Sequence, residues 1–193
     1  MIDSFFRATY QKKVMTPFLK WSFLKTVSPS IVTILGLIAG LLIPFCLAWH
    51  FSFSAFFLLL ISGFLDTLDG SLARNQALTS DKGAALDIIS DRIVEIGVVL
   101  GLYLYDPSRA FLSILILGAM LICVTSFLVV GVFTQNDSEK SFHYSPGLIE
   151  RAEAFIFFAL LILFPSFFIP LATLFAALML FTAFHRSYQF ISN

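Results

Sequence analysis

Long apolar runs separated by short polar breaks dominate the pattern of this chain. Each run is close to the roughly 20 residues that a helix needs to cross the hydrocarbon of a bilayer. The predicted spans cover residues 29–49, 51–74, 83–105, 110–133, 146–164 and a last run after the turn at 165–170, ending near 185–186. This pattern predicts an all-α integral membrane fold with six transmembrane helices.

Residues 1–28 have a different pattern, in which aromatic and aliphatic side chains alternate with lysines and an arginine. Such a mixture is typical of an amphipathic helix lying in the headgroup plane; an unstructured basic tail is the alternative. Ser28 and Pro29 then suit the N-cap and first position of a helix. We therefore predict an interfacial amphipathic segment over 1–28 and a six-helix membrane domain over 29–193.

Composition supports a membrane protein. Hydrophobic residues make up 59% of the 193 residues and charged residues only 12%, against about 45–50% and about 25% in soluble domains. The excess apolar surface has to face lipid. The formal net charge is zero, so no overall field favours a nucleic-acid partner.

The placement of basic residues predicts the orientation. Arg109 is the one basic residue in the loops near 49–52, 105–109 and 165–170, whereas the termini and the other loops are rich in them. Because cytoplasmic loops carry an excess of Lys and Arg, both termini and the 74–82 loop are predicted to be cytoplasmic. That side carries Arg7, Lys12, Lys13, Lys20, Lys25, Arg74, Lys82, Lys140 and Arg186.

Four carboxylates occur where the second and third spans approach the cytoplasm. Asp66 and Asp69 are spaced i, i+3, and Asp87 and Asp91 are spaced i, i+4, so each pair lies on one face of its helix. The short linker predicts antiparallel neighbouring helices whose acidic faces meet. A charge within a bilayer costs about 3 kcal/mol at a helix centre, so such residues are functional candidates.

Converging carboxylates repel one another unless cations lie between them. Two divalent ions would resolve this, and all-oxygen ligation favours Mg²⁺ or Mn²⁺ over zinc, with Ca²⁺ a further candidate. Interhelical salt bridges with nearby Arg and Lys side chains are one alternative. A carboxylate-lined ion path, as in a cation transporter, is another, although transporter sites are expected nearer the bilayer midplane.

The residues between the carboxylates favour an enzyme. Gly70 and Gly83 would let a ligand approach the backbone, although helix packing is an alternative for each. Arg74 offers a planar fork of donors for phosphate oxygens. The full string reads Asp66-x2-Asp69-Gly70-x2-Ala73-Arg74-x8-Gly83-x3-Asp87-x3-Asp91.

That string resembles the motif of the CDP-alcohol phosphotransferase (CDP-alcohol phosphatidyltransferase) family at all eight fixed positions. The resemblance implies transfer of a substituted phosphoryl group from a CDP-linked lipid to a small alcohol, with release of CMP. It implies that Asp66, Asp69, Asp87 and Asp91 bind the metal ions and that Asp91 is also the catalytic base. It further implies a cytidine pocket shaped by Gly70, Ala73 and Gly83, with Arg74 on the diphosphate.

One position departs from the family. Many members carry Pro-Asn before the first span and Thr three residues after the Asn, whereas this chain has Pro29, Ser30 and Thr33. Ser30 and Thr33 are expected on the nucleotide by this resemblance. Ser is shorter than Asn, which weakens the expected contact at Ser30.

The acceptor pocket is predicted from charged residues at the same depth. Arg151, Arg186 and Glu95 are its candidates, and ion pairs of Arg151 with Glu153 or of Arg92 with Glu95 are the alternatives. Arg92 after Asp91 looks similar to family members that use inositol phosphate, so a phosphorylated polyol is the expected acceptor. Glycerol phosphate and serine stay open.

Two other features bear on these expectations. An intramembrane prenyltransferase also binds a diphosphate with Mg²⁺ and carboxylates, but typically on two separated helix pairs. The GxxxG matches at Gly36 and Gly40 and at Gly97 and Gly101 permit close helix contact, for which internal packing is the favoured use. A homodimer is expected by family resemblance alone.

Overall fold

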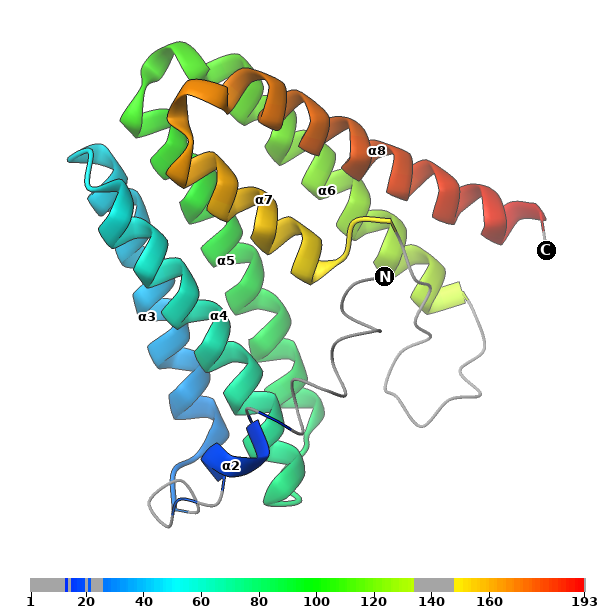
Figure 1. The fold of residues 1–193 in the computed structure, drawn as a ribbon. Helices are drawn as coiled ribbons and strands as arrows, with labels where there is room; N and C mark the ends of the chain where they lie inside the picture. Colours follow the sequence, from blue (N-terminus) through cyan, green and yellow to red (C-terminus); the bar gives the residue numbers. More distant parts are fainter. Residues whose placement is uncertain (1–12, 14, 20, 22–25, 134–147, 193) are drawn as a thin grey trace. The chain divides into compact units, whose positions relative to one another are not determined.

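The chain was analysed as a computed structural model (Figure 1) that describes residues 13, 15–19, 21, 26–133 and 148–192. Every regular element among these residues is a helix. The prediction of an all-helical fold is therefore confirmed. The described residues up to Pro107 form one compact unit and those from Ser108 onward form another.

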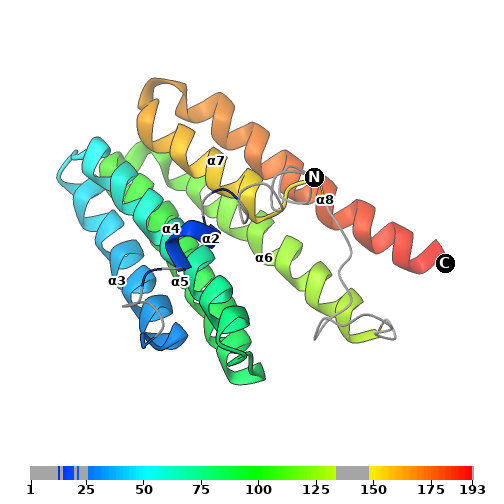
Figure 2. The same cartoon turned by 60° about the horizontal axis from the view of Figure 1, so that its bottom comes forward.

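Three long helices make up the first unit: α3 (Pro29–Ala48), α4 (Ser52–Asn75) and α5 (Asp81–Tyr105). They run side by side in both views (Figures 1 and 2), and α3 packs against both α4 and α5. Ser28 is the N-cap of α3 and Pro29 its first residue, as predicted. Thus α3 positions the two helices that carry the carboxylates.

Glycines bring α3 and α5 into close contact. A Cβ atom on Gly101 would lie 2.8 Å from the Cα of Pro44, and one on Gly40 would overlap the side chain of Val94. Gly97 faces the same seam, with the Gly40 carbonyl oxygen 3.8 Å from its Cβ position. The GxxxG glycines at this seam therefore pack helices of one chain together, which was the favoured interpretation of the sequence.

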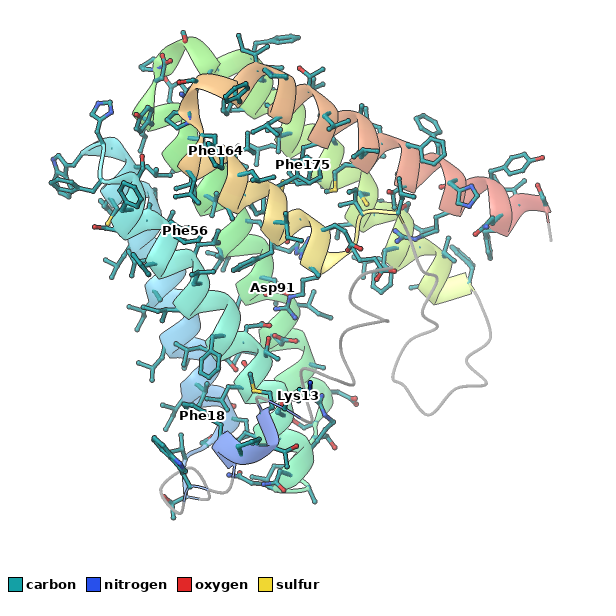
Figure 3. The ribbon with its side chains drawn as sticks, in the orientation of Figure 1. Lys13, Phe18, Phe56, Asp91, Phe164 and Phe175 are labelled. Carbon is teal, nitrogen blue, oxygen red and sulfur yellow. The ribbon has the colours of Figure 1, made fainter. Side chains whose placement is uncertain are left out.

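A short helix, α2 (Thr16–Leu19), packs at the cytoplasmic end predicted for this unit. Met15, just before it, is fully buried in a cluster with Val32, Leu68 and Leu72. Phe18, labelled in Figure 3, makes an edge contact with Phe64 of α4 at 5.3 Å between ring centroids. Most of the predicted interfacial segment 1–28 lies outside the described residues, so that prediction stays untested.

The second unit begins within η3 (Pro107–Arg109) and contains α6 (Ala110–Phe133), α7 (Arg151–Leu163), η4 (Pro165–Phe167) and α8 (Phe168–Ser192). Helix α8 packs against both α6 and α7. Its Phe175, labelled in Figure 3, stacks on Phe157 of α7 at 4.9 Å and meets Phe158 edge-on at 5.4 Å. Aromatic contacts around the fully buried Phe175 therefore join α7 to α8.

Two predicted boundaries are wrong. The fifth helix begins at Arg151 instead of near Pro146, because Glu150 is its N-cap and the Glu150 backbone N–H donates to Glu153 Oε2 at 3.2 Å. The sixth runs on to Ser192, past the predicted end near Arg186, since neither Gly nor Pro interrupts the sequence there.

The structure confirms fewer membrane helices than the sequence predicts. Within the described residues, four segments are long and apolar enough to cross a membrane: Pro29–Ala48, Ser52–Asn75, Pro107–Phe133 and Pro165–Ser192. Helix α5 is long enough, at 25 residues, but carries several charges, and α7 has only 13 residues. These four segments indicate a multi-pass membrane protein. Length and composition do not show that α5 and α7 also cross the membrane.

Candidate active site

Three carboxylates from two helices converge in the first unit. Asp66 and Asp69 of α4 and Asp87 of α5 each offer an oxygen, and these oxygens all lie within 4.8 Å of one another. Asp69 is the most enclosed, with 4% of its surface exposed. The predicted meeting of the two acidic helix faces is confirmed for these three residues.

This group fits a hard divalent cation. Mg²⁺ takes oxygen ligands at about 2.0–2.1 Å, so oxygens on opposite sides of one ion are about 4.2 Å apart. The spacing of the three carboxylates is close to that limit, and small side-chain movements would bring them to it. Carboxylates without His or Cys exclude the usual structural zinc ligand sets. The arrangement therefore suits Mg²⁺ or Mn²⁺.

Asp91 lies one turn beyond Asp87 on α5 and is not part of this three-residue group. Its Oδ2 is 4.0 Å from Arg92 Nη2, whose stronger partner is Glu95 at 2.7 Å. Figure 3 labels Asp91 on its helix. The ion pair of Arg92 with Glu95, which was the alternative to an acceptor role for Glu95, is thus present in the structure.

Gly70 has no helix packed over it among the described residues. A Cβ atom there would come within 4 Å of the Arg74 guanidinium alone, at 3.4 Å from Nη1 and 3.9 Å from Nη2. Arg74 also donates from Nη2 to Ser71 Oγ at 3.4 Å. Helix packing therefore does not explain Gly70, whereas it does explain Gly40 and Gly101.

Gly83 lies at the start of α5 beside the helix cap. Its backbone N–H donates to the side chain of Ser80, the N-cap, at 3.1 Å, and a Cβ on Gly83 would lie 3.3 Å from the same oxygen. Gly83 therefore belongs to a capped helix start rather than to a helix seam. Ala73, half-buried, lies on α4 one residue before Arg74.

Thr33 and Ser30 differ sharply in their surroundings. Thr33 is buried, and its hydroxyl donates to Asp69 Oδ2 at 2.5 Å. Ser30 is exposed in the first turn of α3. The sequence predicted nucleotide contacts for both residues and missed the bond from Thr33 to a carboxylate 36 positions away.

The remaining acceptor candidates belong to the second unit. Arg151, the first residue of α7, is exposed. The Glu153 carboxylate accepts a hydrogen bond from the backbone N–H of Glu150. Arg186 is 5% exposed, and its Nη1 donates to the Cys123 carbonyl and to Ser126 Oγ, each at 3.2 Å. The Nε of Arg186 makes no hydrogen bond to any residue that the structure describes.

Comparison with known proteins places this all-helical membrane protein in a family. The family model described as CDP-alcohol phosphatidyltransferase matches residues 26–185. The chain belongs to the CDP-alcohol phosphatidyltransferase family. The enzyme class implied by the sequence motif is therefore confirmed.

Individual relatives agree with this assignment. The inner membrane protein YnjF of Escherichia coli (strain K12) is 34% identical over 170 residues, which are 83% of this chain and 81% of that protein. A phosphatidylinositol phosphate synthase of Streptomyces avermitilis is 29% identical, over 81% of this chain and 64% of its own length.

A solved structure shares the fold. The crystal structure of Mycobacterium tuberculosis phosphatidylinositol phosphate synthase with CDP-DAG bound matches 92% of this chain and 94% of that one, with a TM-score of 0.76 and 20% identity.

Proposed function

We propose that this protein transfers a phosphatidyl group from a CDP-linked diacylglycerol to a phosphorylated polyol of the inositol phosphate class, releasing CMP. The observation that carries the proposal is the group of Asp66, Asp69 and Asp87 within the family's motif. Relatives named phosphatidylinositol phosphate synthase support the acceptor class.

In this proposal Asp66, Asp69 and Asp87 would hold two Mg²⁺ or Mn²⁺ ions, with Asp91 as a fourth ligand. Such ions, when bound, would offset the negative charge of the diphosphate and of the departing CMP. The chain's contribution is to supply oxygens from two helices at fixed separation. Helix α3, packed on both, keeps that separation.

We assign Asp91 as the base. It takes the proton of the acceptor hydroxyl as that oxygen bonds to the phosphatidyl phosphorus. The bond from this phosphorus to the bridging oxygen breaks, and CMP leaves with the electron pair. Asp91 lies outside the three-residue group and is 20% exposed at its side chain, which leaves it accessible to an entering hydroxyl.

The nucleotide is proposed to lie along the open face of α4. Gly70, whose Cβ position meets only Arg74, would admit the cytidine, together with Ala73 and Gly83. The Arg74 guanidinium would turn from Gly70 towards the diphosphate. Ser30 and Thr33 at the start of α3 complete the proposed nucleotide contacts.

The acceptor is proposed to bind Arg151, Arg186 and Glu95. Arg151 is exposed and can hold two phosphate oxygens at once. Arg186 is fixed by the Cys123 carbonyl and Ser126, and its Nε offers a further donor. Because Glu95 is paired with Arg92, an acceptor hydroxyl would have to share that carboxylate with Arg92.

We further propose six membrane crossings, with the termini and the active site on the cytoplasmic side. The basic residues of the predicted cytoplasmic segments support this orientation. Arg109, the one basic residue predicted on the far side, is buried: its Nη2 donates to the Pro165 carbonyl at 3.1 Å and its guanidinium lies over the Phe168 ring. A homodimer, proposed from family resemblance, is testable by mass measurement in detergent.

A CMP-release assay tests the proposed reaction. Purified protein with CDP-diacylglycerol and Mg²⁺ or Mn²⁺ would be given inositol phosphate, glycerol phosphate or serine in turn, with Asp66→Asn as the inactive control. We expect CMP release to depend on metal and to be greatest with inositol phosphate. Faster CMP release with glycerol phosphate or serine would show that this compound, and not inositol phosphate, is the acceptor. The absence of CMP release with every acceptor would contradict the proposed reaction.

A further inference from the structure

The side chain of Thr33 links the first turns of α3 to the acidic group on α4. Its hydroxyl lies 2.5 Å from Asp69 Oδ2 and 3.2 Å from the Pro29 carbonyl oxygen. An ionised carboxylate can only accept, so Thr33 is the donor. The hydroxyl has one proton, and the shorter contact has the length of a charge-assisted O–H···O⁻ bond. Asp69 is therefore its principal acceptor.

The register of the two helices fixes this contact. Two turns away from Asp69, Ser62 of α4 donates to the Gly36 carbonyl of α3 at 2.9 Å. The absence of a side chain at Gly36 permits that approach, since a Cβ there would already lie 3.4 Å from Leu65 Cβ. Two buried hydrogen bonds thus join antiparallel α3 and α4, and the outer one ends on a carboxylate of the site.

Both partners of this hydrogen bond are buried, and so are the residues before them. Val32 and Leu68, the chain neighbours of Thr33 and Asp69, are 3% and 4% exposed and belong to the cluster that includes Met15 and Leu72. Thr33 itself is 9% exposed. Where water is excluded, a hydrogen bond to a charged oxygen is stronger and leaving that oxygen without it costs more.

We propose that Thr33 is a positioning residue that orients the Asp69 carboxylate for a divalent cation. This inference rests on the proposed metal site and goes beyond the nucleotide contact expected from the sequence. The bond to Oδ2 uses one of the roughly four lone-pair directions of a carboxylate and restrains its rotation. Outer-shell donors of this kind commonly contribute about 10–100-fold to metal affinity.

Manganese binding without nucleotide separates this role from a nucleotide contact. The metal-stripped protein in detergent would be titrated with Mn²⁺ alone, and free Mn²⁺ measured by electron paramagnetic resonance. We expect Thr33→Val, which has nearly the same shape but no donor, to raise the Mn²⁺ Kd by roughly 10–100-fold. Thr33→Ser, which keeps the hydroxyl, should bind Mn²⁺ nearly as wild type does.

Thr173→Val is the matched control. Thr173 of α8 is exposed, and its hydroxyl donates at 2.8 Å to the Ile169 carbonyl, four residues earlier. The Thr33 hydroxyl lies 3.2 Å from the corresponding carbonyl and also donates to Asp69, whereas Thr173 has no carboxylate partner among the described residues. Its Mn²⁺ affinity should equal that of wild type. If Thr33→Val does not fold, the Mn²⁺ affinities of Thr33→Ser, which keeps the hydroxyl, and Thr33→Ala, which lacks it, can be compared instead.

The possible results separate this inference from the proposed function. A wild-type Mn²⁺ Kd in Thr33→Val, together with a raised KM for the CDP donor, would overturn the positioning role and support a nucleotide contact. Equal weakening in Thr173→Val would also overturn it. Asp87→Asn should lose Mn²⁺ binding; if it bound as tightly as wild type, or if wild type did not bind, the metal site itself would be wrong.

Discussion

Asp87 and Asp91 lie one turn apart on α5, yet their surroundings differ. Asp87 shares the three-carboxylate group with two residues of α4, whereas Asp91 is next to Arg92 and outside that group. A carboxylate held among other carboxylates suits metal binding, and one beside the group suits proton transfer to or from an entering ligand. The difference supports separate principal roles for the two residues, metal binding for Asp87 and proton transfer for Asp91.

Asp91→Asn is expected to abolish turnover while the protein stays folded and binds the CDP donor. Asn is nearly the same size but cannot take the proton. The variant should keep less than about a tenth of the wild-type kcat, a loss of more than about 1.4 kcal/mol in transition-state stabilisation. Asp81→Asn, an exposed carboxylate in the first turn of the same helix, is the control and should stay active. Equal kcat values for the Asp91 variant and wild type would remove the base assignment.

Gly70→Leu should impair donor binding more than chemistry. The new side chain would occupy the space between the helix and the Arg74 guanidinium, which lies 3.4 Å from the Cβ position, and so displace both the cytidine and its diphosphate contact. The KM for the CDP donor should rise at least about tenfold, or about 1.4 kcal/mol.

Gly118→Leu is the control for that measurement. Gly118 of α6 is exposed, and a Cβ there meets no described atom within 4 Å, so a side chain at this position starts in open space. An unchanged donor KM with a lowered kcat in Gly70→Leu would place Gly70 outside the nucleotide pocket.

Arg151→Ala distinguishes acceptor classes. A phosphorylated acceptor brings negative charge towards a site rich in carboxylates, so a fixed cation beside it is needed. Because Arg151 is exposed, we expect a rise in acceptor KM of at least about tenfold rather than the larger loss of a buried pair. The donor KM should stay unchanged, and Lys82→Ala, an exposed cation on α5, serves as control. The same acceptor KM in wild type and Arg151→Ala would contradict the phosphate contact.

The sequence predicted where the helices lie along the chain better than it predicted which helices contact one another. The starts and ends of α3, α4, α5 and α6 were predicted within about two residues, because turn residues and polar breaks mark them. Periodicity also brought Asp66, Asp69 and Asp87 together correctly. Neither the Thr33 to Asp69 bond nor the packing of α3 against both acidic helices was predicted, since such contacts depend on helix register and not on local pattern.

Packing of α3 on α5 gives a prediction at this scale. Gly101→Ala should lower stability, because its Cβ would lie 2.8 Å from the Pro44 Cα and must displace backbone; overpacking of this kind costs about 1–3 kcal/mol. Gly97→Ala is the matched control, since its Cβ would make ordinary contacts at 3.8 and 3.9 Å. Thermal unfolding in detergent should show a lower Tm for Gly101→Ala alone. Equal Tm values for the two variants would mean that the seam is not closely packed.

At the scale of the whole molecule, the number of crossings depends on α5 and α7. Helix α5 has 25 residues, a length of about 37 Å, which exceeds the roughly 30 Å of hydrocarbon. Its charges all lie between Asp81 and Glu95, towards the predicted cytoplasmic end. Helix α7 has 13 residues, a length of about 20 Å, so it can span the hydrocarbon only together with the residues that flank it. Helix α5 is thus long enough to cross but carries several charges, whereas α7 is apolar but short.

Cysteine labelling tests both crossings in a background in which Cys46 and Cys123, the two native cysteines, are replaced by Ala. Single cysteines at Thr79 and Ser108 bracket α5, and single cysteines at Leu148 and Ser166 bracket α7; all four positions are exposed.

An impermeant maleimide applied to intact cells should label the cysteines at 108 and 166 directly. Those at 79 and 148 should react only after the membrane is opened, because the positive-inside rule places them in the cytoplasm. Labelling of 148 and 166 from the same side would show that α7 does not cross, and labelling of 79 in intact cells would invert the orientation and place the carboxylates outside. Either result leaves the metal chemistry of Asp66, Asp69 and Asp87 intact, so the topology is decided independently of the site.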